Sequence, residues 1–306
     1  MSTFLVVQAT GGQSQWVITH LLKSGAKVHA LVRDVNKPLP AILKAEGVTL
    51  FQGEALDSDA VYAAAKSTTG VFLNTFTSET EIQQAESVIE GARRAGVETI
   101  VASTAIGSGD KTVLESEHTK NSGLHMYYVN KNGIEEAVKK GGFKSWTILH
   151  PAYIHFDIFT PRNAFNFPRM PQGILDHVLD AGRKIAHTDA SDIGRYATAA
   201  LTDPAKFNGE IVELGLAMDC DEMAAGLSKV SGKKVEAVRY TFEEARKAGV
   251  FQFGMAFQLL ANGFDFSDLA GAGLRNQEKY GMGLMTFEES MVRDKEELMS
   301  TLVAVN

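Results

Sequence analysis

The sequence is poor in cysteine, and this lack excludes two kinds of stabilisation. The 306 residues include one cysteine, Cys220, so the chain can form neither an intramolecular disulfide nor a zinc site built from several thiolates. A chain of this length buries about three quarters of the surface that its unfolded form exposes, so it folds without either device. The single cysteine fits a reducing compartment, and we expect a cytoplasmic protein. The spacing of His, Asp and Glu residues does not indicate a metal site.

An excess of positive charge is also lacking. The 30 Lys and Arg residues are outnumbered by 37 Asp and Glu residues, which gives a formal net charge of −7. The cations are scattered, whereas a protein that binds a phosphate backbone usually has a basic face. The N-terminus lacks the basic region of a signal peptide, and no apolar run approaches the length of a bilayer span. The composition therefore argues against direct binding to nucleic acid and against a membrane protein.

What the sequence does contain is a series of short apolar runs that alternate with helical patterns. Such runs predict strands that are buried on both faces of a parallel sheet. These strands are expected at 4–7, 28–32, 48–51, 71–73, 99–102 and 146–149. The pattern predicts an α/β fold, a doubly wound parallel sheet of the Rossmann type.

The sequence changes in character after Pro151. Residues 153–171 are rich in aromatic residues and prolines, and we expect an ordered, irregular segment there. One more strand is expected near 210–214, and the chain beyond it has mostly helical patterns. We therefore expect a Rossmann domain over 1–152 and a smaller, mostly helical lobe over 153–306, with the strand near 210–214 returning to the sheet region.

The turn after the first strand has the position of a phosphate-binding loop. Ligands of open α/β sheets bind beyond the carboxyl ends of the strands, where small residues let backbone N–H groups approach a pyrophosphate. The spacing fits a GxxGxxG variant at positions 8, 11 and 14, of which only Gly11 is glycine. Gln8 replaces the first glycine by a large side chain. Ser14 replaces the third glycine and could also cap the helix. The alternative is an ordinary strand-to-helix turn.

The second and third strands end in charged residues that suit a phosphorylated ribose. An Arg in the position of Arg33 binds the 2′-phosphate of NADP, whereas NAD sites use a carboxylate there. NADP(H) is therefore the expected cofactor, and a solvated surface Arg is the alternative. After the third strand, Glu54 could accept a hydrogen bond from the adenine amino group. A carboxylate there could equally cap the next helix, for which Asp57 is better placed.

In order and spacing, these motifs resemble the NmrA-like branch of the atypical short-chain dehydrogenases. The matching segments run from residue 4 to about 240 and include Ala9-Thr10-Gly11-x-Gln13, Arg33, Lys131-x-x-x-Glu135-Glu136, His150-Pro151-Ala152-Tyr153, Asp189-x-x-Asp192-Ile193-Gly194 and Leu201-Thr202-Asp203-Pro204. The resemblance implies a Rossmann domain and a small substrate lobe, with NADP(H) in the cleft. It also implies one of two functions: NADPH-dependent reduction of quinones, isoflavonoids or biosynthetic intermediates, or redox sensing without turnover through a protein partner.

The resemblance further assigns cofactor-binding residues. Those implied for the pyrophosphate are Thr10, Gly11, Gln13 and Ser14. Those implied for the 2′-phosphate and the adenine are Arg33, Glu54 and Ala55. Those implied for the ribose and nicotinamide side are Asn74, Thr75, Phe76 and Lys131. Those implied to close over the nicotinamide are Pro151, Ala152 and Tyr153.

A tyrosine and a lysine four residues apart supply a candidate proton donor. Short-chain dehydrogenases protonate their substrate through a Tyr whose pKa is lowered by such a Lys, and Tyr127 and Lys131 share one helix face. Ser103, at the end of the fifth strand, would complete the catalytic set. Because NmrA-like proteins usually keep the Lys and lack the Tyr, a packing role for Tyr127 is the alternative. His150 and His155 are expected to be structural histidines.

Aromatic and apolar side chains of the second half could wall a cleft for an apolar or aromatic substrate. They are Phe156, Phe159, Phe165, Phe167, Phe251, Phe253, Met255 and Phe257. The alternatives are that they form the core of the lobe, or that some are exposed as a homodimer or protein-partner surface. The favoured hypothesis is an NADPH-dependent oxidoreductase that reduces a small apolar carbonyl, enone or quinone-like substrate. A non-catalytic NADP(H)-sensing regulator and a family member with non-redox chemistry are the alternatives.

Overall fold

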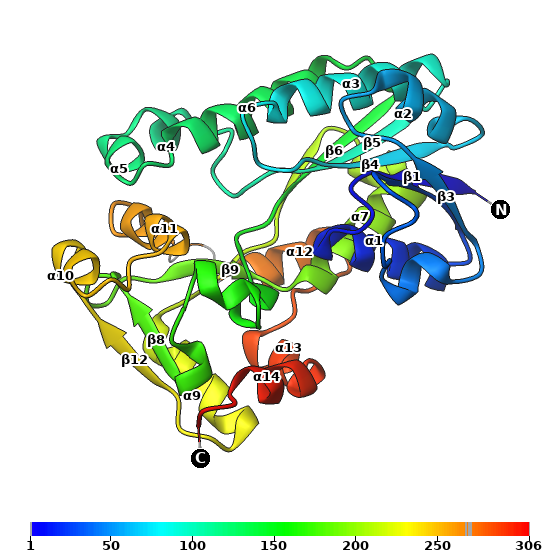
Figure 1. Cartoon of the computed structure of the whole chain (residues 1–306). Helices are drawn as coiled ribbons and strands as arrows, with labels where there is room; N and C mark the ends of the chain where they lie inside the picture. Colours follow the sequence, from blue (N-terminus) through cyan, green and yellow to red (C-terminus); the bar gives the residue numbers. More distant parts are fainter. Residues whose placement is uncertain (1, 267, 269–270, 306) are drawn as a thin grey trace. The chain divides into compact units, whose positions relative to one another are not determined.

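The computed structural model of the protein describes residues 2–266, 268 and 271–305 (Figure 1). The chain divides into two compact units, and each unit is built from three segments. The first unit contains Met1–Asp110, Tyr127–Pro151 and Ala190–Glu213. The second unit contains Lys111–Met126, Ala152–Asp189 and Leu214–Asn306.

A 7-stranded parallel sheet forms the centre of the first unit. Its strands are β1 (Thr3–Val6), β2 (Lys27–Val32), β3 (Val48–Gln52), β4 (Gly70–Asn74), β5 (Thr99–Ser103), β6 (Ser145–His150) and β10 (Glu210–Glu213). The strand order is β10-β6-β5-β4-β1-β2-β3, which confirms the predicted doubly wound Rossmann fold. The order reverses between β1 and β4, and sheets of this kind bind ligands in the crevice at that reversal.

Helices cover both faces of this sheet. One face carries α2 (Ser58–Ala65), α3 (Glu81–Arg94) and α6 (His125–Lys140), while the other carries α1 (Gly12–Lys23) and α7 (Ala190–Thr202) (Figure 1). Two short elements, the 3-10 helix η1 (Ala41–Lys44) and the helix α8 (Pro204–Phe207), complete the unit. Helix α2 begins where the sequence predicts, because the Asp57 carboxylate accepts hydrogen bonds from two backbone N–H groups of its first turn.

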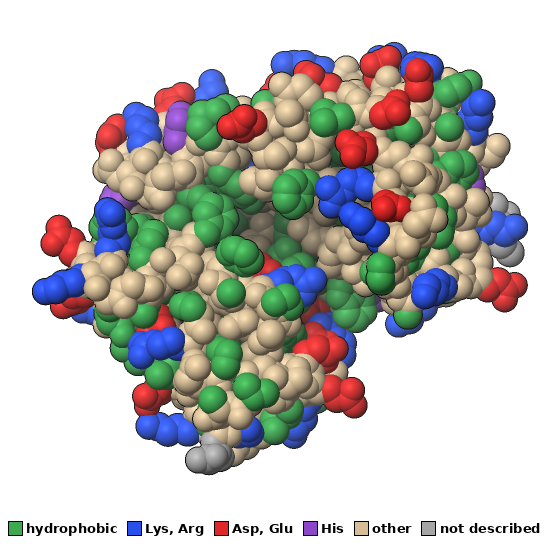
Figure 2. All heavy atoms as spheres, viewed as in Figure 1, with side chains coloured by type: hydrophobic (Ala, Val, Ile, Leu, Met, Phe, Trp, Pro, Cys, Tyr) green, Lys and Arg blue, Asp and Glu red, His purple; other side chains and the backbone are tan. Residues whose placement is uncertain are grey.

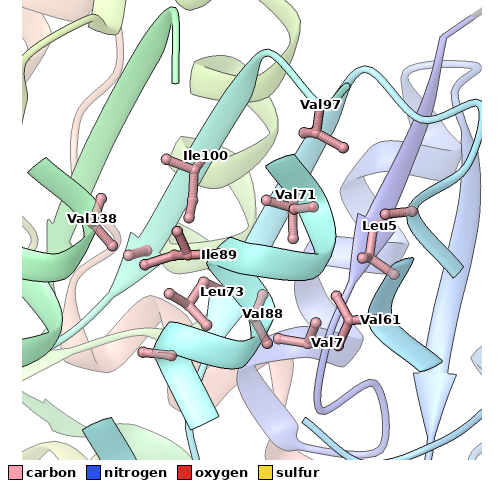
Figure 3. Close-up of a cluster of buried hydrophobic side chains, with 14 of the residues drawn as sticks. Leu5, Val7, Val61, Val71, Leu73, Val88, Ile89, Val97, Ile100 and Val138 are labelled. Atoms are coloured by element: carbon pink, nitrogen blue, oxygen red, sulfur yellow. The ribbon is translucent and has the colours of Figure 1, made fainter. Parts of the chain in front are cut away.

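One hydrophobic core of this unit lies between the sheet and the helices α2, α3 and α6. Figure 3 shows the side chains of β1, β4 and β5 pointing toward those of the helices, with Leu5, Val71 and Ile100 facing Val61, Val88 and Ile89. The strand residues Leu5, Val71 and Ile100 are fully buried. This burial explains why the strands appear in the sequence as unbroken apolar runs.

The second unit combines two small sheets with short helices. One sheet has the order β11-β9-β7 and the other pairs β12 with β8. The strands are β7 (Tyr153–Ile154), β8 (Ile174–His177), β9 (Ile185–Thr188), β11 (Leu216–Met218) and β12 (Glu236–Arg239). The helices are α4 (Lys111–Glu115), α5 (Glu117–Asn121), α9 (Cys220–Ser231), α10 (Phe242–Lys247), α11 (Phe253–Ala261), α12 (Ala272–Tyr280), α13 (Phe287–Arg293) and α14 (Lys295–Thr301). The irregular segment predicted at 153–171 contains strand β7 and the 3-10 helices η2 (His155–Ile158), η3 (Arg162–Phe165) and η4 (Met170–Gln172).

The aromatic side chains of the second unit divide between core and surface. Phe159 and Phe167 are buried in one hydrophobic cluster and Met255 in another, so for these three the core alternative is correct. Phe165 and Phe253 are 66% and 56% exposed.

Charges of both signs are interspersed on the face of the molecule drawn in Figure 2. Within the described ranges, no helix combines the length and the apolar character needed to cross a membrane.

Candidate functional site

A pocket opens at the carboxyl ends of four neighbouring strands of the first unit. Its walls come from the segments that end or follow β1, β2, β3 and β4. The lining residues are Gln8, Thr10, Leu31, Val32, Arg33, Gly53, Glu54, Ala55, Leu56, Phe76, Ser78, Thr80 and Gln84. Because β1 and β4 flank the reversal of the strand order, the pocket lies at the place where doubly wound sheets bind their ligands.

The N-terminus of α1 follows Thr10 of this pocket and is not capped by a side chain. Gly11 is the N-cap residue, so no side chain accepts hydrogen bonds from the first N–H groups of the helix. The Gly11 N–H donates to the Gln8 carbonyl at 2.8 Å, and a Cβ on Gly11 would lie 3.1 Å from that oxygen. Uncapped N–H groups and the positive end of the helix dipole together suit an anion such as a pyrophosphate.

Positions 8 and 14, where the GxxGxxG spacing would have glycine, tolerate a larger residue for different structural reasons. Gln8 has φ 53°, the left-handed conformation that favours glycine, so the turn keeps the backbone of a glycine loop without the glycine. Ser14 is fully buried, and its hydroxyl donates to the Val7 carbonyl at 3.0 Å. The prediction that Ser14 could cap the helix is wrong, because this bond ties α1 to the end of β1.

Several residues predicted to bind the cofactor do line the pocket. Thr10, Arg33, Glu54 and Ala55 lie together there. Phe76, which the resemblance assigned to the ribose and nicotinamide side, lines the same pocket as Arg33 and is 65% exposed. The pocket therefore combines an exposed cation at the end of β2 with an apolar ring, and Thr10 of its lining lies just before the uncapped N-terminus of α1. This arrangement fits an adenosine phosphate.

The predicted lysine is part of a buried ion pair that the sequence does not predict. Lys131 Nζ lies 2.6 Å from Glu81 Oε1, and the Thr75 hydroxyl donates to the same oxygen at 2.8 Å. Both charged side chains are buried, and Glu81 Oε2 has no hydrogen-bond partner among the described residues. The only signal in the sequence is an acidic residue at the start of the helix that follows β4.

The other two residues of the predicted catalytic set lie near this lysine or on the adjacent strand. Lys131 Nζ is 5.3 Å from the centroid of the Tyr127 ring, so the two are neighbours on α6 as predicted. The Ser103 hydroxyl is buried and donates to Gln13 Oε1 at 2.7 Å. The structure thus joins the end of β5 to the glycine loop. Asn74 pairs with Ser103 in the register of β4 and β5.

His150, the last residue of β6, belongs to a second buried network, which is centred on Glu135, one turn after Lys131 on α6. Its Nε2 lies 2.8 Å from Glu135 Oε1, which also accepts hydrogen bonds from Ser108 and Thr104. Burial pushes the pKa of Glu135 upward, but these hydrogen bonds outweigh it and hold the pKa below its ordinary value. The network fixes the loop that follows β5. Pro151, which directly follows β6, is also buried.

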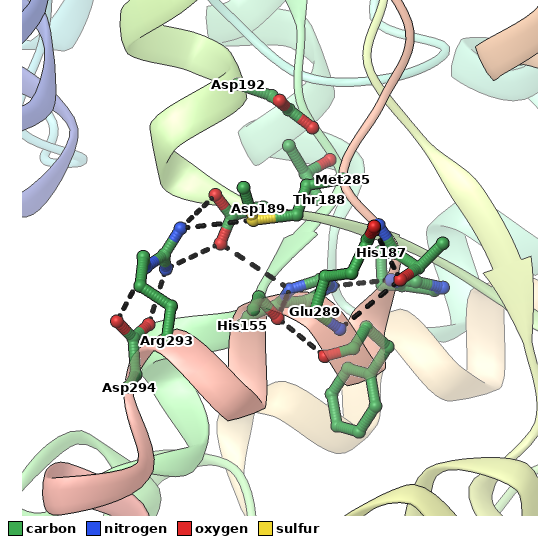
Figure 4. Close-up of polar contacts among 12 residues, drawn as sticks. His155, His187, Thr188, Asp189, Asp192, Met285, Glu289, Arg293 and Asp294 are labelled. Atoms are coloured by element: carbon green, nitrogen blue, oxygen red, sulfur yellow. Dashed lines mark hydrogen bonds and ion pairs between the residues drawn. The ribbon is translucent and has the colours of Figure 1, made fainter.

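The second unit has its own polar cluster, in which the buried residues His155, His187, Ser290 and Asp189 are joined by the partly exposed Arg293 (Figure 4). The Ser290 hydroxyl donates to the Phe287 carbonyl, so it accepts from His155 Nδ1 at 2.6 Å. His155 Nε2 then accepts from His187 Nδ1, also at 2.6 Å. This chain of bonds requires the His155 ring to be neutral, because its Nδ1 donates while its Nε2 accepts.

Asp189 and Arg293 form an ion pair at one side of this cluster. The carboxylate accepts two hydrogen bonds of 2.8 Å from the guanidinium, and one of its oxygens lies 3.8 Å from His155 Nδ1.

Tyr153 begins β7 in the same unit, and burial raises the pKa of its hydroxyl well above its ordinary value. In the part of the chain that the structure describes, no group of three or more His, Cys, Asp or Glu side chains could hold a metal ion.

Comparison with known proteins gives consistent matches along the whole chain. A model of the NmrA-like family matches residues 1–301. An NAD(P)H azoreductase of Xenophilus azovorans is 28% identical over 245 residues, which cover 80% of this chain and 79% of that protein.

Solved structures agree on the fold. The NADPH complex of a quinone oxidoreductase of Escherichia coli has a TM-score of 0.70 and 22% identity, and the match covers 95% of this chain and 99% of that one. The NAD complex of the negative transcriptional regulator NmrA has a TM-score of 0.73 and 19% identity, and the match covers 97% and 96% of the two chains. At these identities the structural likeness establishes the fold alone.

Proposed function

The chain belongs to the NmrA-like family, and on this premise we propose that it is an oxidoreductase that binds NADP(H) in the pocket of the first unit. The observation that carries the proposal is the position of Arg33, an exposed cation at the end of β2 in the same pocket as Glu54 and Ala55. A guanidinium there suits the 2′-phosphate that distinguishes NADP from NAD. The uncapped N-terminus of α1 suits the pyrophosphate.

The proposed substrate is a small apolar carbonyl, enone, quinone or azo compound. The relatives named above include an azoreductase and a quinone oxidoreductase, and their names support reduction of a conjugated acceptor. When bound, the reduced nicotinamide supplies a hydride to such an acceptor. This chain must then supply a proton, and Tyr127 or a water molecule held by Lys131 is the proposed source.

The ion pair between Lys131 and Glu81 limits what the lysine does for Tyr127. An ammonium 2.6 Å from a carboxylate carries a compensated charge, so it stabilises a neighbouring phenolate less than an unpaired lysine would. This observation favours a second candidate function, in which NADP(H) is sensed and not turned over.

Calorimetric titration of the wild type and R33A with NADPH and NADH tests cofactor binding. We expect R33A to weaken NADPH binding about 10- to 100-fold, since it removes a charge-assisted hydrogen bond, and to leave NADH binding unchanged. R183A, at another exposed arginine, is the matched control and should bind as the wild type does. Failure of the wild type to bind either cofactor would overturn the proposal.

A turnover assay then separates the two candidate functions. NADPH oxidation is followed with a quinone and with an azo dye, for the wild type and Y127F. Loss of turnover in Y127F with unchanged NADPH affinity would support Tyr127 as the proton donor. Tight NADPH binding without oxidation by any acceptor would support the sensor.

A further inference from the structure

The residue that replaces the first glycine of the loop makes a contact that a glycine could not. Gln8 Nε2 donates to Gln84 Oε1 at 3.3 Å, across 76 positions of sequence. Gln8 is the second residue after β1, and Gln84 lies in the first turn of α3, which follows β4. The bond therefore links the two strands at which the strand order reverses, and both side chains line the pocket.

The Gln84 side chain forms hydrogen bonds with the loop between β4 and α3. Its Oε1 accepts from the Phe76 N–H at 3.1 Å, while its Nε2 donates to the Phe76 carbonyl at 3.1 Å and to the Ser78 hydroxyl at 3.0 Å. With the bond from Gln8, both protons and both lone pairs of this amide are used. The side chain is 6% exposed, so little water is available to replace a lost partner.

The two backbone contacts fix which way the Gln84 amide faces. A backbone N–H can only donate and a carbonyl can only accept, so Oε1 must face the Phe76 N–H and Nε2 must face the Phe76 carbonyl. The remaining lone pair of Oε1 then requires a donor, and the Gln8 amide supplies one. A glutamine at position 8 thus meets a specific hydrogen-bonding need.

We propose that Gln8 and Gln84 form a brace that holds the glycine loop and the Phe76–Ser78 segment in the conformation that binds the adenosine half of the cofactor. This inference rests on the proposed NADP(H) site and makes Gln8 a positioning residue. The brace holds the Phe76 side of the pocket in place in the free protein, so the protein loses less conformational entropy when the ligand binds. In the opposing view, the Gln8 side chain is an obstruction in a degraded glycine loop.

The variant Q8G separates these views, because glycine adopts the left-handed backbone of position 8 readily and lacks the side chain. Binding is measured by calorimetry with 2′,5′-ADP, which carries the adenosine half alone. We expect Q8G to bind about three- to tenfold more weakly, the loss of one neutral hydrogen bond. Affinity equal to or tighter than that of the wild type would overturn the brace.

A second readout needs no ligand. The Phe76 amide is protected by Gln84, so hydrogen exchange of residues 75–79 should be faster in Q8G and in Q84M than in the wild type. Q83M, one position along the same helix at an exposed residue, is the matched control and should exchange as the wild type does. Unchanged exchange in Q8G would overturn the proposal.

The double variant tests whether the two glutamines act together. If the Gln8 bond acts through Gln84, then Q8G combined with Q84M should bind 2′,5′-ADP no more weakly than Q84M alone. Additive losses would instead show that Gln8 acts on its own and would overturn the brace. If the wild type fails to bind 2′,5′-ADP and NADPH, the proposed function fails, and the exchange of residues 75–79 still decides the brace.

Discussion

At the scale of single residues, burial keeps two neighbouring histidines of the second unit neutral. Burial is the main cause that lowers the pKa of His187 to about 4, with Lys184 adding to the shift and Glu222 opposing it. The pKa of His155 lies well below its ordinary value because of burial, the adjacent His187 and Arg293. A proton on His155 Nε2 would also face the N–H of His187.

These shifts predict a loss of stability on mild acidification. In the unfolded chain both histidines take up protons near pH 6.5, whereas the folded protein resists protonation until about pH 4 for His187. The unfolded state therefore binds more protons in this window, and the free energy of unfolding falls as the pH falls. We expect His187 to account for about 2 kcal/mol between pH 7 and pH 5.

Urea unfolding of the wild type and H187N at a series of pH values measures this contribution. Asparagine retains an N–H donor but does not titrate, so the pH dependence should be shallower in H187N. Burial raises the pKa of Asp157 to about 6, so the folded state binds this proton more readily than the unfolded state does. Asp157 therefore makes the free energy of unfolding rise as the pH falls, and it does so equally in the wild type and in H187N. The difference between the two curves is thus the relevant quantity, and parallel curves would contradict the prediction.

At the scale of elements, one glycine determines how closely two helices of the first unit approach each other. A Cβ on Gly91, in α3, would lie 2.6 Å from the Ser58 carbonyl oxygen and 2.7 Å from Val61 Cβ, both on α2. These are backbone and Cβ atoms, so a larger residue would have to move the whole helix.

We expect G91A to destabilise the protein by about 1–3 kcal/mol, although alanine is the better helix former. G273A is the matched control, because a Cβ there would meet its nearest atom, Leu216 Cδ2, at 3.7 Å, an ordinary contact. This variant should be neutral or stabilising by up to about 1 kcal/mol. Urea unfolding measures both, and equal effects would show that helix propensity decides and packing does not.

At the scale of the whole molecule, the pocket that we assign to the adenosine half is lined by residues of the first unit. The second unit contributes buried clusters of its own, including the histidine pair. A ligand that carries the adenosine half alone should therefore act on one unit.

Hydrogen exchange in the presence of saturating 2′,5′-ADP tests this expectation. Protection should increase in the segments 8–13, 31–35, 53–57 and 76–84, because bound ligand opposes local opening. Peptides of β12 and α9 serve as internal controls and should not change. Protection that appears first or mainly in these control peptides would contradict the assigned pocket.

The strands of the first unit and the family follow from the sequence alone. The runs at 71–73 and 99–102 became β4 and β5, and Asp57 caps α2 as predicted, because apolar periodicity and caps depend on neighbouring residues. The resemblance drawn from ordered motifs is confirmed by the match over residues 1–301. The short strands of the second unit, such as β9, were not predicted, since four residues carry little periodic signal.

Which side chains meet follows only from how the elements pack in three dimensions. Lys131 pairs with Glu81 across 50 positions, and His155 meets Ser290 across 135, so no local pattern relates the partners. Ser14 faces Val7 instead of the helix N–H groups because α1 packs closely on β1. Strand order brings together the loops after β1 and β4, and only that juxtaposition gives Gln8 a partner in Gln84. Local sequence sets elements through short-range sterics and burial, whereas contacts between distant residues depend on how those elements pack.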